Sequence, residues 1–182
     1  MPPDHHPDRE RLDTPRLHLR RPRAADAAAI FAYASDPDVT HYMSFPRHVT
    51  IDQTRAFLDF CDDEWARWPA GPYLIERRDD GRVVGGTGLG FESPWCASTG
   101  YLLARWAWGQ GYAAEALAAM VEVARAAGVV RLYATCHVDH VRSRRVLEKT
   151  AFTREGLLRR HTVFPNLSPS PLDTWLYARV FA

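Results

Sequence analysis

The chain has 182 residues, enough for one domain of ordinary size with a sizeable core. Its composition, 46% hydrophobic and 25% charged, is typical of a soluble globular protein. The formal net charge is only +1, so no long-range attraction to nucleic acid or to an anionic membrane is expected. No apolar run approaches the roughly 18 to 20 residues that span a bilayer. We therefore expect a single domain without nucleic-acid or membrane partners.

The N-terminus and the cysteines indicate a cellular compartment. The segment MPPDHHPDRERLD lacks the apolar region of a secretory signal, and we predict a disordered tail over residues 1–13 and one domain over 14–182. Cys61, Cys96 and Cys136 form no CxxC pair and are odd in number. This argues against a disulfide framework and indicates a reducing, cytoplasmic location. No metal site is expected.

The first predicted elements are a strand and two helices. Arg16–Arg21 alternates apolar and polar residues, which indicates a half-buried strand, and Ala24–Ser35 is predicted as a helix. Residues 36–50 contain two prolines and several turn formers, so a long loop is expected there. Thr50 can cap a second helix, whose apolar residues recur at helical spacing as far as Trp65.

A hairpin and a further strand follow. Tyr73–Arg77 and Arg82–Phe91 are joined by Asp79–Gly81, and an Asp-Gly turn between such runs is a strong hairpin signal. A third strand is predicted at Ser98–Ala104.

The second half of the chain alternates helices and strands. Tyr112–Ala127 places its apolar residues on one helical face and ends at Gly128, a typical C-terminal stop. This order of elements predicts an α/β fold with one mixed sheet and helices on both faces. The remaining predicted elements are the strand Val130–His137, the helix Val141–Thr150, and the strands Thr153–Val163 and Thr174–Phe181.

The segment from Tyr101 to Ala116, YLLARWAWGQGYAAEA, is the most informative for chemistry. A buried strand runs into Gly109 and Gly111 and then directly into a helix. Glycine lets the backbone approach a ligand closely, and the first amides of a helix have no internal partners. Together with the helix dipole, they form a site suited to phosphate or pyrophosphate. A tight turn without any ligand is the alternative interpretation.

Two familiar nucleotide-binding motifs do not fit this loop. A Walker A loop needs Gly-Lys-Ser/Thr after its glycines, and no such run occurs. The dinucleotide fingerprint needs a third glycine, where Ala114 stands, and an acidic residue at the end of the next strand, which instead ends in Cys136 and His137.

The loop resembles that of the GNAT acetyltransferases, which carry Arg/Gln-x-x-Gly-x-Gly/Ala between a strand and a helix. Trp108–Ala113 fits except at the first position, where an aromatic is typical of the Rim-type branch that acetylates ribosomal-protein N-termini. SRRVLEKTAFTREGLLRR and DTPRLHLRRPRAADAAAIFAYASDPDVTHYMSF are also similar to that branch, so the resemblance covers about Asp13 to Phe181. It implies a single-domain, mostly antiparallel mixed sheet whose central strands splay apart.

The resemblance implies acetyl-CoA as the acyl donor. Main-chain amides of Gly109–Ala114 would hold the coenzyme pyrophosphate, and the strand at Leu103 and Ala104 would pair with the pantetheine arm. The coenzyme-binding residues so implied are Leu103, Ala104, Trp108, Gly109, Gln110, Gly111, Tyr112, Ala113, Ala114, His140, Ser143 and Arg144.

Catalytic roles carry over only in part. Ser143 matches a serine near the thioester sulfur, and its hydroxyl can protonate the departing thiolate or simply cap the helix it begins. The family's general-base glutamates fall at Ser98 and Thr162, neither of which is a carboxylate. His140 stands in place of the usual asparagine. The remaining candidates for the base are Glu92, His137, Asp139 and His161, of which we take Glu92 and His161 as the catalytic candidates.

These features predict an N-acetyltransferase in which a primary amine attacks the thioester directly. The acceptor would be a protein N-terminus or a small molecule, bound between the loop around Tyr42 and Phe45, the second helix and the strand near Glu92. The alternatives are a non-catalytic acyl-CoA-binding or regulatory module on the same fold, and a nucleotide-phosphate-binding protein outside the family. By family habit the chain would be a monomer or a homodimer.

Overall fold

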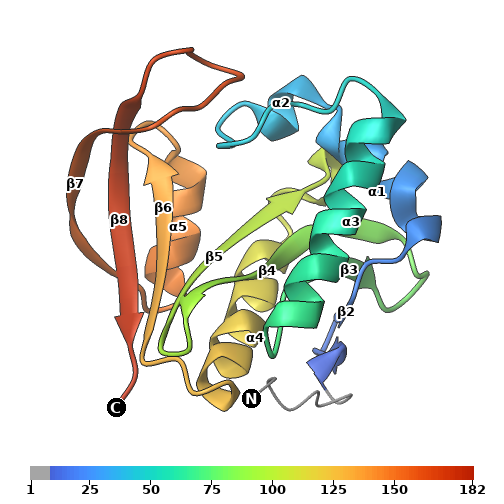
Figure 1. The fold of residues 1–182 in the computed structure, drawn as a ribbon, viewed down its shortest axis with the longest axis horizontal. Coiled ribbons are helices and arrows are strands. Elements are labelled where there is room, and N and C mark those ends of the chain that lie inside the picture. Colours follow the sequence, from blue (N-terminus) through green and yellow to red (C-terminus); the bar gives the residue numbers. More distant parts are fainter. Residues whose placement is uncertain (1–8) are drawn as a thin grey trace.

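The computed structural model describes residues 9–182, which fold around one eight-stranded sheet in the order β1-β2-β3-β4-β5-β6-β8-β7 (Figure 1). All neighbouring strands are antiparallel except β5 and β6, which run parallel. The predicted mixed, mostly antiparallel sheet is therefore confirmed. The strands are β1 (Arg11–Asp13), β2 (Leu17–Arg20), β3 (Pro72–Arg77), β4 (Val83–Ser93), β5 (Cys96–Leu103), β6 (Arg131–His137), β7 (Thr153–Thr162) and β8 (Leu172–Val180).

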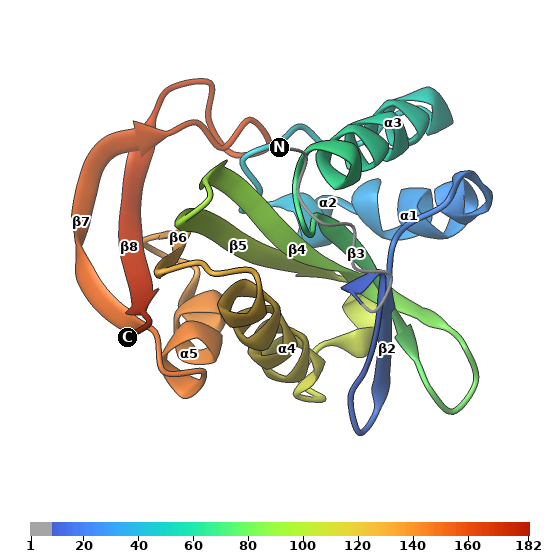
Figure 2. The same cartoon turned by 60° about the horizontal axis from the view of Figure 1, so that its bottom comes forward.

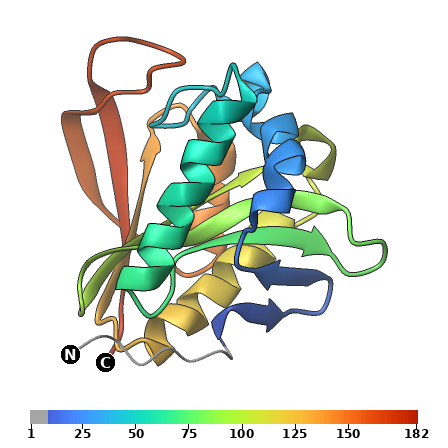
Figure 3. The same cartoon turned by 45° about the vertical axis from the view of Figure 1, so that its right-hand side comes forward.

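Helices cover both faces of the sheet, as the sequence predicts (Figure 2). The helices α1 and α3 lie on one face, where α3 runs beside α1 (Figure 3), and α4 and α5 lie on the other. No helix of residues 9–182 has the length and apolarity needed to cross a membrane. The helices are α1 (Ala27–Ala34), α2 (Pro37–Thr40), α3 (Ile51–Arg67), α4 (Tyr112–Ala126) and α5 (Val141–Lys149).

The long helix α3 begins at the predicted cap. Thr50 is its N-cap, and the Gln53 side chain accepts hydrogen bonds from the amides of Thr50 (3.2 Å) and Val49 (2.6 Å). This leaves fewer unpaired amides at the start of the helix. The buried stripe Thr54, Leu58, Cys61 and Trp65 then fixes which side of α3 faces the protein.

The central strands separate after a short pairing. β5 and β6 pair only at Cys96↔Arg131, Ala97↔Leu132 and Ser98↔Tyr133. Beyond Ser98 they diverge, while β6 stays paired with β8 along its whole length (Figure 1). The splay implied by the resemblance is confirmed, and from Thr99 onward the outer edge of β5 has no strand partner among the described residues.

The short elements β1 and α2 were not predicted. The strand β1 occupies Arg11–Asp13, which we had expected to belong to a disordered tail over residues 1–13. Residues 1–8 of that expected tail lie outside the described part of the chain. Three residues are too few to show an alternating pattern, and β1 exists because it pairs with β2. The helix α2 lies inside the predicted loop, where the Asp36 carboxylate accepts from the amides of Asp38 (2.9 Å) and Val39 (3.4 Å).

Candidate functional site

The loop before α4 has the backbone geometry that an anion site needs. Gly109 and Gly111 have φ of 76° and 81°, in the left-handed region that favours glycine. Gly111 is the N-cap of α4, so the first amides of this helix, from Tyr112 onward, have no intrahelical acceptor. The positive end of the helix dipole adds to their attraction for a phosphate group.

Arg16 of the segment before β2 braces this loop, a contact that the sequence did not predict. Its Nη1 donates to the Gln110 carbonyl (2.9 Å), and its Nε pairs with Glu115 Oε2 (2.7 Å). Thr14 Oγ1 also donates to Glu115 (2.6 Å). Burial alone would raise the pKa of Glu115, but the hydrogen bonds from Thr14 and Arg16 outweigh it and lower that pKa. Glu115 is therefore an ionised carboxylate in the first turn of α4, close to the candidate anion site at the start of this helix.

The residues assigned to the pantetheine strand already use part of their hydrogen-bonding capacity. Trp108 Nε1 donates to the Leu103 carbonyl (2.9 Å), and the Ala104 amide donates to Val84 (2.8 Å). The open edge of β5 begins earlier, at Thr99. Pairing of the coenzyme arm with Leu103 and Ala104 stays a prediction, and the Thr99–Tyr101 segment is the more accessible part of the same edge.

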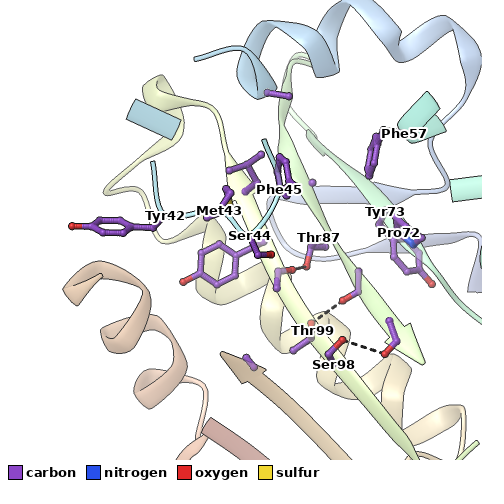
Figure 4. A pocket seen from close by; sticks show the side chains of 18 of the residues that line it. Tyr42, Met43, Ser44, Phe45, Phe57, Pro72, Tyr73, Thr87, Ser98 and Thr99 are labelled. Atoms are coloured by element: carbon purple, nitrogen blue, oxygen red, sulfur yellow. Dashed lines mark hydrogen bonds between the residues drawn. The ribbon is translucent and has the colours of Figure 1, made fainter. Parts of the chain in front are cut away.

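A cavity of about 870 Å³ extends through the gap between β5 and β6 (Figure 4). On one side of the sheet it is lined by Leu117 of α4 and by Ser143 and Leu147 of α5. On the other side it is lined by Phe57 of α3 and the Tyr42–Pro46 loop. The splay therefore joins the two faces of the sheet through one continuous space.

Ser143 lines the cavity and has a hydrogen-bond partner, Tyr101, that the sequence did not predict. The Tyr101 hydroxyl donates to Ser143 Oγ (3.2 Å), and both residues line the cavity. Burial raises the pKa of Tyr101 to about 12, so its hydroxyl stays protonated. Because Ser143 Oγ accepts from Tyr101, its own hydrogen is free to be donated into the cavity.

His140 and Tyr42 connect the acceptor loop to the start of α5. The Tyr42 ring stacks on His140 (centroids 4.7 Å apart) and on His137 (5.0 Å). Burial, with smaller contributions from Arg142 and His137, lowers the pKa of His140 to about 4, so its imidazole is neutral at neutral pH. Stacking of Tyr42 on the neutral His140 ring holds the loop after α2 beside the gap.

Asn166, in the loop between β7 and β8, holds the same segment by hydrogen bonds. Its Nδ2 donates to the carbonyls of Thr40 (2.8 Å) and Phe45 (2.9 Å), and its Oδ1 accepts from the Arg47 amide (2.8 Å). One side chain thus joins two loops that are more than a hundred residues apart in the sequence.

The candidate bases occupy different positions. Glu92 is exposed and is not among the cavity-lining residues, but it accepts a hydrogen bond from the hydroxyl of Tyr133, which does line the cavity. His161 is exposed and contacts Thr162 Oγ1 (3.0 Å). Thr162 lines the cavity and His161 does not, so this geometry gives His161 no direct approach to a bound substrate.

Two further residues complete the description of the site. Arg144 Nε is buried without a hydrogen-bond partner among residues 9–182, and its assignment to the coenzyme stays a prediction. His48 lines the cavity, contacts Thr54 Oγ1 (2.8 Å), and has its pKa lowered by burial. No local pattern in the sequence singles out His48, because its contacts depend on how the 41–50 segment folds back onto α3.

Known proteins resemble this chain in sequence and fold. The family model "Acetyltransferase (GNAT) domain" matches residues 16–153. The uncharacterized N-acetyltransferase YoaA of Bacillus subtilis (strain 168) is 31% identical over 93% of this chain and 96% of its own. Among solved structures, the ribosomal L7/L12 α-N-protein acetyltransferase RimL in complex with coenzyme A superposes with a TM-score of 0.83 at 24% identity, covering 94% of this chain and 98% of that one.

The microcin C7 self-immunity acetyltransferase MccE, solved with acetyl-CoA and AMP, superposes with a TM-score of 0.80 at 19% identity, over 92% of this chain and 94% of that one. At such identities the two structures establish the fold, while the family model covers most of the chain. The splayed strands, the glycine loop before α4 and these matches agree: the chain belongs to the GNAT acetyltransferase family.

Proposed function

We propose that this chain transfers the acetyl group of acetyl-CoA to a primary amine. The proposal rests on one continuous cavity, which passes through the gap between β5 and β6 and is lined by residues on both faces of the sheet. It provides a donor side lined by residues of α4 and α5 and an acceptor side lined by residues of α3. The complexes of RimL with coenzyme A and of MccE with acetyl-CoA support the choice of donor.

On the donor side, the amides of Gly109–Ala114 would bind the pyrophosphate, with Arg16 compensating the nearby charge of Glu115. The pantetheine arm would extend along the open edge of β5 by adding backbone hydrogen bonds. The thioester then lies next to Ser143, which is oriented by Tyr101. Main-chain amides of this edge of β5 would stabilise the oxyanion that forms on the thioester carbonyl.

The reaction needs a neutral amine at the gap. Its nitrogen attacks the thioester carbonyl and forms the carbon–nitrogen bond, and the carbon–sulfur bond breaks as Ser143 gives its proton to the departing thiolate. The proton that the nitrogen then loses restores the Ser143 hydroxyl, so the products are the amide and the free thiol. Holding both reactants in contact supplies much of the acceleration, at best about 7 to 11 kcal/mol. For an amine that arrives protonated, Tyr133 offers a route for its proton to Glu92, which is how Glu92 would act from outside the cavity.

The test is release of free coenzyme A thiol from acetyl-CoA in the presence of a broad panel of amines. The proposal predicts amine-dependent release together with a product that is one acetyl group heavier by mass spectrometry. The Ser143→Ala variant should bind acetyl-CoA but release thiol much more slowly.

A non-catalytic acyl-CoA-binding module is the second candidate. Ser98 and Thr162, which occupy the family's base positions, both line the cavity without supplying a carboxylate. Saturable acetyl-CoA binding without thiol release on any amine would favour this role over catalysis.

A further inference from the structure

Four glycines of the sheet line the acceptor side of the cavity. Gly86, Gly88 and Gly90 alternate along β4 and therefore share one face, and Gly100 of β5 pairs with Gly88. Gly86 pairs with Leu74, which belongs to the core under α1 and α3, so this face is the acceptor side. All four line the cavity, and we call them the glycine floor.

Packing explains three of these glycines but not the fourth. A Cβ at Gly88 would lie 2.7 Å from Pro72 Cα, one at Gly90 would lie 2.9 Å from Ser98 Oγ, and one at Gly86 would lie 3.2 Å from the Tyr33 hydroxyl. A Cβ at Gly100 would meet nothing within 4 Å, and its φ lies outside the left-handed region. A glycine inside a strand weakens it and often marks the place where a ligand approaches the backbone closely.

The surface on the other side of this space is aromatic. The helix α3 turns a second stripe toward the cavity, which Phe57 of this helix and Phe45 of the loop after α2 both line (Figure 4). Phe60 is 51% exposed and Phe45 37% exposed, although both line a cavity. Apolar side chains that stay open to a cavity indicate an apolar ligand. The stripe consists of Gln53, Ala56, Phe57, Phe60 and Glu64.

The charge of the cavity limits what can bind. Of the residues that the structure describes, Glu64 is the single carboxylate in the lining, and no lysine or arginine lines it. A polyamine or an aminoglycoside would need several carboxylates, and an acidic acceptor would need a cation. The lining fits a ligand with one amine and an uncharged apolar body.

Resting on the proposed function, we infer that the acceptor is a small primary monoamine with a flat aromatic body. The body lies on the glycine floor against Phe57 and Phe60, and the amine points to the β5–β6 gap, where the thioester carbonyl is bound. A side chain at Gly100 would occupy the place of the aromatic body.

The experiment measures thiol release with four matched amines: 2-phenylethylamine, its saturated analogue 2-cyclohexylethylamine, spermidine and a short peptide with a free N-terminus. The inference predicts a kcat/KM for 2-phenylethylamine about tenfold or more above each of the other three, because only this amine combines a flat body with a single charge.

Two variants test the floor directly. Gly100→Val should raise the KM for 2-phenylethylamine at least about tenfold, because the new side chain projects from the acceptor face of β5. The Kd for acetyl-CoA should stay nearly unchanged, because the pantetheine arm would pair with backbone groups at the edge of this strand and not with side chains on its face. Gly156→Val is the matched control, because Gly156 also lies in a strand, a Cβ there also meets nothing within 4 Å, and it does not line the cavity. This control should leave both constants unchanged.

The possible failures are distinct. No thiol release with any amine would overturn the proposed function itself. Release that is best with spermidine, with the peptide or with the cyclohexyl analogue would leave the acetyltransferase in place and overturn the flat-amine class. An unchanged KM in folded Gly100→Val, with acetyl-CoA binding intact, would show that the acceptor does not lie on the glycine floor.

Discussion

Arg16 and Glu115 lie 99 positions apart in the sequence and form an ion pair, with 2.7 Å between Arg16 Nε and Glu115 Oε2, next to the loop before α4. Glu115 lies in the first turn of α4, where its negative charge favours the helix but opposes a bound pyrophosphate. Arg16 resolves this conflict because it neutralises Glu115 and also donates to the Gln110 carbonyl of the loop.

Removing Arg16 should therefore weaken acetyl-CoA binding, because the Glu115 carboxylate would then repel the pyrophosphate without a neighbouring cation. We expect Arg16→Ala to raise the Kd for acetyl-CoA by about tenfold, equivalent to ~1.4 kcal/mol. The double variant Arg16→Ala/Glu115→Gln should bind more tightly than Arg16→Ala alone, because the uncompensated carboxylate is gone. Calorimetry on the single and double variants measures this coupling, and a double variant that binds no better would refute the charge argument.

Ser143 and Tyr101 should act as one unit. Loss of the general acid in Ser143→Ala is expected to lower kcat by about 10²-fold or more. Tyr101→Phe removes the hydrogen bond that orients Ser143 and should lower kcat less, with little change in the Kd for acetyl-CoA. Added to Ser143→Ala, it should have no further effect. Additive losses of kcat in the double variant would mean that the two hydroxyls work independently.

His140 should make the fold sensitive to acid. Its pKa is lowered from 6.5 to about 4 in the folded chain, so between these values the unfolded chain binds more protons than the folded one. Stability from this residue is therefore full above about pH 6.5 and falls as the pH approaches 4. Replacement by asparagine, a good N-cap residue, removes the titration.

Melting temperatures across this pH range test that assignment. The wild type should lose more stability than His140→Asn between pH 6.5 and 4. Parallel curves for the two proteins would show that His140 titrates normally in the folded state.

Asn166 should control the acceptor side only. Asn166→Ala removes three hydrogen bonds to the 40–47 segment, each worth about 0.5 to 1.5 kcal/mol, and frees this edge of the acceptor pocket. We expect the acceptor KM to rise about tenfold with an unchanged Kd for acetyl-CoA. Ser168→Ala, in the same loop, is the control because the Ser168 hydroxyl contacts Ser170 and not that segment. Equal effects of both variants on the acceptor KM would argue against a role of the Asn166 hydrogen bonds in acceptor binding.

The sequence predicted those parts of the protein that local patterns encode. The helix α4, its stop and the two glycines before it are visible because periodicity and glycine placement act within a few residues. The alternation Gly86-x-Gly88-x-Gly90 was equally visible, but its meaning depends on Gly100 and on the cavity above it.

The contacts that complete the site could not be predicted because they join distant segments. Arg16 reaches Glu115, Tyr42 stacks on His140, and Asn166 reaches Phe45, and no spacing rule connects such pairs. The base candidates show the same limit, since only the folded chain places Thr162 at the cavity and His161 outside it.

Coenzyme binding at the loop before α4 is tested most directly by a calorimetric titration of acetyl-CoA into the wild-type protein and into Gly111→Glu. At Gly111, where φ is 81° and a Cβ would lie 3.3 Å from Arg16 Nη2, glutamate both strains the loop and places an anion in the pyrophosphate site. We predict saturable one-site binding to the wild type and none to the variant. Folded wild type that does not bind acetyl-CoA, or a variant that binds it equally well, would contradict it.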